Sequence, residues 1–247
     1  MPTRTGAQWR SGRLEFFDKV TQEIVQPIAP ILFEEEWFGA WTVVPAAAAA
    51  ESGCKWVKKI VGAGPPTVGI LADGDGGQAE CALQADNQKQ SCDIYMDDNR
   101  QFSIEYDTMI EMWVNVAVLP TDVAELTWGL VGDWADGYDA ITYSALFTAD
   151  GSGEIFCELD DDATNSSATS GVTVTAGVWH CYKIDFSDLT SVKYYIDGVR
   201  VAVATTFPYV ATGANAVLQP LVGGYKATGT GVGTVNCRNV RIWGNRA

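Results

Sequence analysis

The clearest pattern in the chain is a run of alternating apolar and polar residues from Gln101 to Leu119, QFSIEYDTMIEMWVNVAVL. An alternation of period two is typical of a β-strand with one buried face. The apolar parity, which we expect in the core, consists of Phe102, Ile104, Tyr106, Ile110, Met112, Val114, Val116 and Val118. The opposite parity predicts a mixed face of Ser103, Glu105, Asp107, Met109, Glu111, Trp113 and Asn115.

A second pattern, SVKYYIDGVRVAVATTF, predicts a β-hairpin. The Asp197-Gly198 pair supplies the positive φ angles of a type I′ turn, and apolar residues alternate on both sides of it. The turn sets the register, because a slip by one residue would bury Lys193 and Arg200. The expected cross-strand pairs are Ile196 with Val199, Tyr195 with Arg200, Tyr194 with Val201, Lys193 with Ala202 and Val192 with Val203. One face of the hairpin is therefore expected to be wholly apolar and buried.

Short apolar runs separated by Gly, Asp, Asn and Ser continue through the chain from residue 31, and no segment has a convincing helical period. Strands at this spacing indicate an all-β sandwich or barrel, and no long internal repeat suggests a propeller or solenoid. The first thirty residues differ, since GRLEFFD and EIVQPI are short β-like runs that flank KVTQ. We therefore predict an N-terminal arm or hairpin over 1–30 and one sandwich over 31–247.

The net charge of -15 is distributed unevenly. From Gln101 to Tyr182 the sequence has fourteen acidic residues and no lysine or arginine, whereas the first twenty residues and the C-terminal end carry a small basic excess. Nucleic acid and anionic membranes both require clustered Lys or Arg, so neither is an expected partner. No apolar run has the length of a signal peptide or a membrane span, which predicts an intracellular product without a membrane anchor.

Metal and cofactor sites are not expected. The six cysteines form no C-x-x-C pair, so buried free thiols are favoured and disulfides stay open. His180 is the only histidine and is expected to be packed rather than catalytic. The segment ADGDGGQAE resembles the start of a calcium loop at Asp73 and Asp75, but Gln84 stands where a glutamate ligand is required. A turn rich in Gly and Asp explains this segment better.

A family resemblance is carried by two segments near the C-terminal end. They are Trp179, Tyr182, Ile184 and Phe186 followed by VKYYIDGVRV, and the final LQPLVGGYKATGTGVGTVNCRNVRIW. This pattern resembles concanavalin A-like lectin/glucanase (LamG-like) domains, which implies an antiparallel two-sheet jelly roll with one concave sheet. With an arm such as SGRLEFFDKVTQEIV ahead of the sandwich, the chain looks most like proteins of tailed bacteriophages. Those relatives are commonly virion structural components, including head decoration or cement proteins, although fold does not determine function.

A glycoside hydrolase of this fold needs paired carboxylates on the concave face. The related glucanases carry E-x-D-x-E along one strand; here Glu105 and Asp107 have that spacing, but Glu111 follows too late. A second set that shares one parity consists of Glu158, Asp160 and Asp162. That set enters DDATNSS, which is typical of a loop. We therefore expect no enzymatic activity, and glycoside hydrolysis is the third interpretation.

A sugar-binding site would use aromatic rings next to carboxylates. The segment WGLVGDWADGYDA has that composition, and with a further tryptophan on the mixed face it gives the candidate ligand-binding residues Trp128, Asp133, Trp134, Asp136, Tyr138 and Trp113. The alternative is a loop that folds over the sandwich edge with Trp134 as its anchor.

The resemblance implies a non-enzymatic structural protein of a phage particle, most specifically a capsid decoration or cement protein, made in the host cytoplasm and located on the outer surface of the capsid. Its expected partners are the major capsid protein and copies of itself, preferably as a homotrimer. The basic residues expected to dock on the shell are Arg4, Arg10, Arg13, Arg238, Arg241 and Arg246. The alternative is a lectin-like module that is displayed on the virion and binds surface glycans.

Overall fold

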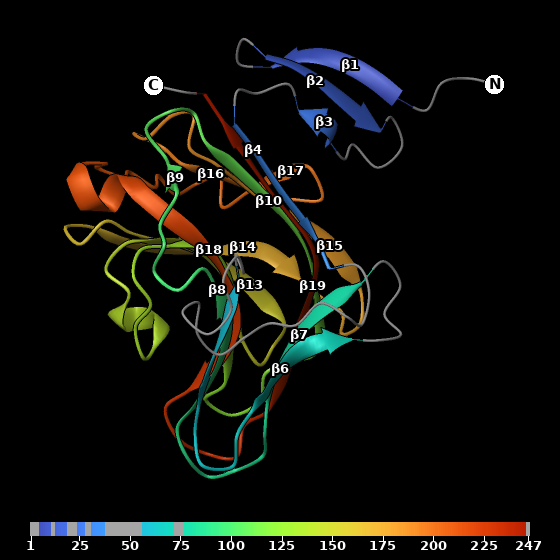
Figure 1. Cartoon of the computed structure of the whole chain (residues 1–247), viewed down its shortest axis with the longest axis vertical. Coiled ribbons are helices and arrows are strands. Elements are labelled where there is room, and N and C mark those ends of the chain that lie inside the picture. The colour runs from blue at the N-terminus through green and yellow to red at the C-terminus, as the bar shows by residue number, and fades with distance from the viewer. Residues whose placement is uncertain are drawn as a thin grey trace.

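The computed structural model of the chain describes residues 5–10, 13–18, 24–27, 31–37, 56–71 and 77–245 (Figure 1). Two large sheets lie face to face, and all strand pairs of the described residues are antiparallel. Helical structure in the same residues is confined to the short 3-10 helices η2 (Tyr138–Ala140) and η3 (Gly213–Ala216). The prediction of an all-β, antiparallel two-sheet sandwich is confirmed.

The first large sheet, here called the β10 sheet, has a central pair of long strands. In spatial order it contains β17 (Val199–Val201), β16 (Lys193–Ile196), β15 (Trp179–Asp185), β10 (Met109–Val118), β19 (Gly233–Gly244), β7 (Gln78–Leu83) and β6 (Thr67–Leu71), with β4 (Ile31–Glu36) also paired to β19.

The second large sheet, here called the β11 sheet, carries the face on which the candidate site lies. Its spatial order is β14 (Asn165–Thr173), β13 (Glu154–Asp160), β12 (Ser144–Ala149), β11 (Glu125–Val131), β18 (Val217–Lys226), β8 (Gln90–Tyr95) and β5 (Val57–Val61), with β9 (Phe102–Ser103) beside β18.

The alternating run from Gln101 to Leu119 forms one strand only in its second half. Strand β10 begins at Met109, and its alternate residues Ile110, Met112, Val114 and Val116 are buried between the sheets, as predicted.

The first half of the run leaves the strand after Ser103. Residues 104–107 form a turn, and Asp107 has a left-handed φ of 51°. The expectation of one continuous strand is therefore wrong there, because a left-handed residue reverses the chain direction. Tyr106 is only half-buried and Val118 is exposed, so these two ends of the predicted core stripe are also wrong.

The Asp197-Gly198 hairpin has the predicted register. Its turn residues have φ angles of 50° and 78°, and the pairs are Ile196 with Val199, Tyr195 with Arg200 and Tyr194 with Val201.

The apolar face of this hairpin is buried only in part. Val199 and Val203 are each 67% exposed, so the prediction of a wholly buried face is wrong at these positions. Strand β17 ends at Val201 and Ala202 has a φ of 51°, which ends the ladder before the predicted pair of Val192 with Val203.

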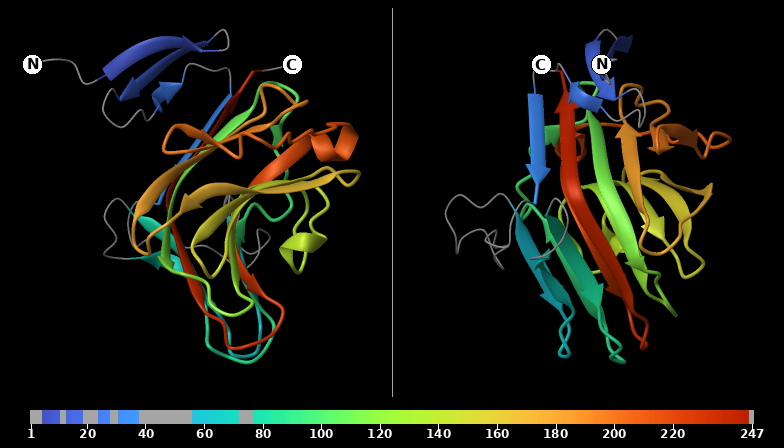
Figure 2. Two further views of the ribbon diagram at one scale, coloured as in Figure 1. Left: turned by 180° about the vertical axis from the view of Figure 1, so that it is seen from behind. Right: turned by 90° about the vertical axis from the view of Figure 1, so that its right-hand side faces the viewer.

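The N-terminal strands form a sheet of their own. Strand β2 (Arg13–Asp18) lies between β1 (Thr5–Arg10) and β3 (Ile24–Pro27), and among the described residues this sheet shares no strand pair with the sandwich. It lies beyond the end of the sandwich where β4 starts and β19 ends (Figure 2). Because β4 pairs with β19, residues 31–36 belong to the β10 sheet.

The cysteines of the described residues are free thiols, four of them buried and Cys181 partly exposed. Burial raises the pKa of the buried thiols, which favours the uncharged, unreactive form. Predictions for Cys54, Asp73 and Asp75 lie outside the described residues. Within the described part of the chain, no helix is long and apolar enough to cross a membrane, and no three metal-binding side chains gather in one place.

Candidate functional site

The outer face of the β11 sheet is covered by residues 132–143, here called the cover loop. Residues from this loop pack with side chains on the sheet face that points away from the main core. This second apolar cluster contains Val57, Tyr95, Val131, Tyr138, Ile141, Leu146 and Leu221, with Trp134, Ala135 and Tyr225 packed against it. The cover loop therefore occupies the part of this outer face that is formed by β5, β8, β11, β12 and β18.

Asp93 on β8 is the anchor of the cover loop. The Trp134 indole Nε1 donates to Asp93 Oδ2 at 2.9 Å, and the Tyr138 hydroxyl donates to Oδ1 at 2.8 Å. The Ser91 hydroxyl donates to Oδ2 as well. Burial raises the pKa of the Asp93 carboxyl to about 6, although these three hydrogen bonds oppose the rise. Because the carboxyl is fully buried and accepts three hydrogen bonds, these contacts hold the cover loop on the sheet.

The neighbouring strand β18 has a glycine, Gly223, directly opposite Asp93. A Cβ atom added to Gly223 on β18 would lie 1.9 Å from Asp93 Oδ1, well inside van der Waals contact. Any side chain at this position would displace the carboxyl that holds the cover loop. The sequence therefore provides the space as well as the donors for this anchor.

The first part of the cover loop is held by polar contacts to neighbouring segments. Asp98 Oδ1 accepts hydrogen bonds from the Trp134 backbone N–H at 2.7 Å and from Gln219 Nε2 at 3.0 Å. Arg100 lies 3.2 Å from the Asp133 carboxylate, and Lys89 forms an ion pair with Asp136. Each of these exposed ion pairs contributes little to stability. Together they give the Asp133 and Asp136 carboxylates cationic partners within the same chain.

The structure thus brings together four of the predicted ligand-binding residues, and each has a partner in the same chain. They are Asp133, Trp134, Asp136 and Tyr138. Lys59 also lies over the Trp134 ring, 4.7 Å from its centroid. This arrangement agrees with the alternative interpretation, a folded-over loop with Trp134 as its anchor.

Trp128 does not belong to any surface site. It lies in β11, is fully buried between the sheets, and contacts Tyr182 with a ring-centroid distance of 4.7 Å. The prediction that Trp128 stacks on a sugar is wrong, because alternation places it on the core-facing parity of its strand.

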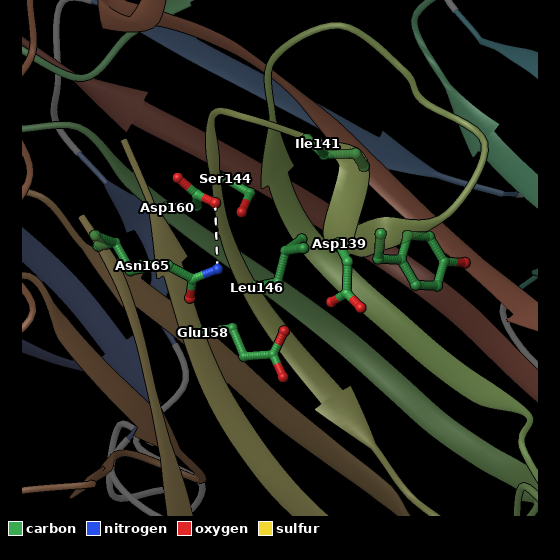
Figure 3. Close-up of a pocket in the computed structure, with 9 residues that line it drawn as sticks. Asp139, Ile141, Ser144, Leu146, Glu158, Asp160 and Asn165 are labelled. Atoms are coloured by element: carbon green, nitrogen blue, oxygen red, sulfur yellow. Dashed lines mark hydrogen bonds between the residues drawn. The ribbon is translucent and has the colours of Figure 1, made fainter. Parts of the chain in front are cut away.

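A small acidic pocket lies beside the cover loop (Figure 3). Its volume is about 20 Å³, and it is lined by Tyr138, Asp139, Ile141, Ser144, Leu146, Glu158, Leu159, Asp160 and Asn165. Glu158 from β13 and Asp139 from η2 direct their carboxylates toward the same space. Burial, helped by the charges of Glu125 and Asp139, raises the pKa of Glu158 to about 7. The pocket has room for about one water molecule and not for a sugar ring.

The acidic pocket was missed by reasoning from sequence. Glu158 and Asp160 lie at the end of strand β13 rather than in a loop, whereas Asp162 is in the following turn with a φ of 72°. The missed signal is the alternation in EIFCELD, where Ile155, Cys157 and Leu159 are all buried. Two carboxyls of a strand thus share its outer face, and one of them is readily protonated near neutral pH.

The acids that resemble the glucanase motif do not form one row. Glu105 is exposed in a turn, and Asp107 accepts a hydrogen bond from Asn245 Nδ2 at 2.6 Å. Glu111 is buried on the outer face of the β10 sheet, 3.8 Å from Arg241 Nη1. These positions do not place a proton donor and a nucleophile on either side of one bond.

The predicted docking arginines are separated by the fold. Arg241 is buried and its Nε lies 2.6 Å from Glu34, so its prediction as a docking residue is wrong. Arg238 is partly exposed and stacks between Trp113 and Trp179, with centroid distances of 4.4 and 5.0 Å. The remaining members are Arg10 and Arg13, which pair at the turn between β1 and β2, and Arg4 and Arg246, which lie outside the described residues.

The lone histidine contacts the turn that defines the hairpin. His180 Nδ1 lies 2.7 Å from Asp197 Oδ2, and the other oxygen of Asp197 accepts the Cys181 backbone N–H at 2.9 Å. These contacts join β15 to the turn, and His180 has no serine partner among its hydrogen bonds in the described part of the chain. The geometry agrees with a packed structural histidine.

The family model of the concanavalin A-like lectin/glucanases superfamily matches residues 68–246. The chain belongs to this superfamily, and the jelly-roll fold implied by the sequence resemblance is confirmed. No curated protein matches the sequence.

Solved structures share the fold at low sequence identity. A protein of unknown function from Shewanella oneidensis MR-1 is 12% identical, with a TM-score of 0.57 and coverage of 86% of this chain and 85% of that chain. A β-1,3-glucanase from Mycobacterium marinum is 15% identical, with a TM-score of 0.53 and coverage of 87% of this chain and 100% of that chain. The carbohydrate recognition domain of Emp47p is 9% identical, with a TM-score of 0.51 and coverage of 78% of this chain and 89% of that chain. The fold therefore occurs both in enzymes and in binding domains, and it does not choose between them.

Proposed function

We propose that this chain is a non-catalytic structural protein of a bacteriophage particle that decorates the outer surface of the head and stabilises it. The observation that carries the non-catalytic part is the cover loop, which packs on the outer face of the β11 sheet through Trp134 and Tyr138. A hydrolase that used this face would need an open cleft there. The assignment to a bacteriophage particle is supported by the arm ahead of the sandwich, which resembles the arms of phage structural proteins.

The docking surface of this proposal is the N-terminal arm together with Arg238. Arg241 is excluded because its charge is used by Glu34 and Glu111 inside the β10 sheet. The body of the chain is strongly acidic, whereas the arm has a small basic excess. A shell with an acidic outer surface would attract the arm and leave the acidic body facing solvent, in a salt-dependent way.

The test uses empty capsids that lack the protein. The full chain should sediment with them, and a variant with Arg10→Glu and Arg13→Glu should bind at least about tenfold more weakly at low salt. Arg200→Glu, on the exposed strand β17, is the matched control and should bind like the parent. Equal binding of the arm variant and the parent, over a range of salt concentrations, would refute docking through the arm. Failure of the parent to bind any capsid would refute the decoration proposal itself.

A second candidate function is glycan binding by the partly exposed aromatic residues on the outer face of the β10 sheet. The observation that favours it is the pairing of Trp113 and Trp179 around Arg238, a partly exposed surface that a sugar ring could contact. A glycan array followed by a tryptophan-fluorescence titration tests this candidate. Binding that is lost in Trp113→Ala and kept in Trp134→Ala would support it, and no binding to any glycan would leave the structural proposal alone.

A further inference from the structure

The strand orders of the two large sheets end in β17 and β6 and in β14 and β5, and three of these four end strands carry features that discourage pairing with another chain. Strand β17 has only three residues and includes Arg200, and strand β5 carries two lysines. Strand β6 is five residues long with a central glycine. Short length, edge charges and glycine all weaken an exposed edge as a template for another strand.

Strand β14 is the exception. It has nine residues, NSSATSGVT, without a charged residue or a proline. Its regular pairing with β13 runs from Asn165 opposite Asp160 to Thr169 opposite Phe156, and the bulge at Gly171 lies beyond this stretch. No strand of the described residues pairs with its other side. Residues 165–169 therefore present a regular, uncharged row of backbone donors and acceptors.

Among the described residues, the N-terminal sheet also has an edge strand that pairs on one side only. Its order is β1-β2-β3, so β1 and β3 are the outer strands. Strand β3 has four residues and ends in Pro27, which lacks the N–H that a ladder needs. Strand β1, TGAQWR, has six residues with neither proline nor acid. Strand β1 is thus the side of this sheet that can accept another strand.

Charge favours the combination of these two edges over self-pairing of either. The strand next to β14 carries Glu154, Glu158 and Asp160 on its outward parity, and the following turn adds Asp161 and Asp162. A second β14 would bring a second set of these carboxylates close to the first. Strand β1 instead brings Arg10 and no negative charge.

We propose that strand β1 of one copy adds to the free edge of strand β14 of a second copy, which extends the β11 sheet by the N-terminal sheet of its neighbour. This inference rests on the proposed function in a head lattice, where neighbouring copies are close together. Main-chain hydrogen bonds supply the affinity in such strand addition, and the acidic surroundings of β14 select a basic strand. Each copy both gives an arm and receives one, so the contact can link copies around a symmetry axis.

A photo-crosslinking experiment on the full chain tests this contact. A photoreactive benzoylphenylalanine replaces Ser167, an exposed residue in the middle of β14, and the variant is mixed with isotopically heavy wild-type chain. The expected crosslink joins the β14 peptide of one copy to residues 5–10 of the other isotope. The matched control carries the same group at Ile60, an exposed position on the lysine-bearing β5 edge, and should give no crosslink to the arm.

Charge substitutions at the same position give a second readout by sedimentation velocity. Ser167→Lys should weaken self-association at least about tenfold, because it opposes a basic strand, whereas Ser167→Glu should not weaken it. Crosslinks from β14 to β14, crosslinks within one chain only, or a strictly monomeric parent would each overturn the proposal. Capsid binding measured on the same variants separates the two ideas: loss of arm exchange with intact capsid binding overturns this inference and leaves the decoration function standing.

Discussion

Tyr138 and Asp93 are 45 residues apart in the sequence, and the Tyr138 hydroxyl donates to Asp93 Oδ1 at 2.8 Å. The donor belongs to the cover loop and the acceptor to the sheet beneath it. Since the Asp93 carboxyl is fully buried, the loop and the sheet depend on each other for hydrogen-bond satisfaction at this point. The closed state of this sheet face therefore depends on one side chain that can be titrated and substituted.

The stability of the wild-type chain should fall relative to Asp93→Asn as the pH rises from about 4 to 6. Burial raises the pKa of Asp93 from 3.8 to about 6, so the folded chain holds a proton that the unfolded chain has released over this interval. A shift of this size corresponds to about 3 kcal/mol between the two ends of the interval. Urea denaturation of both chains at each pH measures the difference, in which the other titrating groups cancel. A flat difference would mean that burial does not raise the pKa of Asp93 above its value in the unfolded chain.

Gly223→Ala should release the cover loop. The added Cβ would meet Asp93 Oδ1 at 1.9 Å, and displacement of the carboxyl would leave the Trp134 and Tyr138 donors without an acceptor. We expect a loss of about 2–4 kcal/mol in the free energy of unfolding, together with faster proteolysis within residues 132–143. Gly69→Ala is the control, because a Cβ there has no atom within 4 Å, and it should be neutral. A stable, protease-resistant Gly223→Ala chain would show that the anchor is dispensable.

The sequence predicts the sandwich well because its information is local. Alternation on β10 and the Asp-Gly turn at Asp197 each specify strands and register within a few residues, and the structure agrees with both. The cover loop could not be predicted in the same way, since its anchor Asp93 is 41 residues from Trp134. An aromatic, acidic loop has the same composition whether its side chains contact a ligand or the protein itself.

The prediction of Arg241 as a docking residue is wrong for a related reason. Charge counted along the sequence does not reveal that Arg241 faces Glu34 and Glu111 across two neighbouring strands. The strand break at Asp107 likewise depends on a backbone φ of 51° that no alternation pattern encodes. When the partner of a charged residue lies in a strand that is distant in the sequence, the residue type alone indicates only a candidate docking residue. The fold is needed to show whether its charge is already paired within the protein.

Glu158→Gln should stabilise the chain above pH 7 and leave it unchanged below pH 4. Burial and the neighbouring acids raise the pKa of Glu158 from 4.5 to about 7, so the wild-type chain loses stability as the pH rises between these two values and loses no more above pH 7. Because the side chain is partly exposed, we expect a gain of only about 1 kcal/mol at pH 8. Thermal unfolding at both pH values measures it, with the exposed turn residue Glu105→Gln as the control that should change nothing.

The same two variants test whether the acidic pocket has hydrolytic activity. The wild-type chain should release no reducing sugar from β-1,3-glucan, since the pocket of about 20 Å³ cannot admit a sugar ring. Release that disappears in Glu158→Gln would contradict the non-catalytic proposal and assign the acid of the reaction.

Arg241→Ala should destabilise the sandwich far more than Arg238→Ala. Removal of the Arg241 guanidinium takes a cation away from Glu111, which is 3% exposed, and loss of one partner of a buried ion pair costs about 3–5 kcal/mol. Arg238 stacks on two partly exposed indoles, and its loss should cost about 1 kcal/mol. Denaturant unfolding measures both, and capsid binding at a temperature where both variants are folded separates stability from docking. If Arg241→Ala is as stable as the parent but binds capsids less well, then Arg241 docks on the shell after all and its ion pairs in the β10 sheet carry little energy.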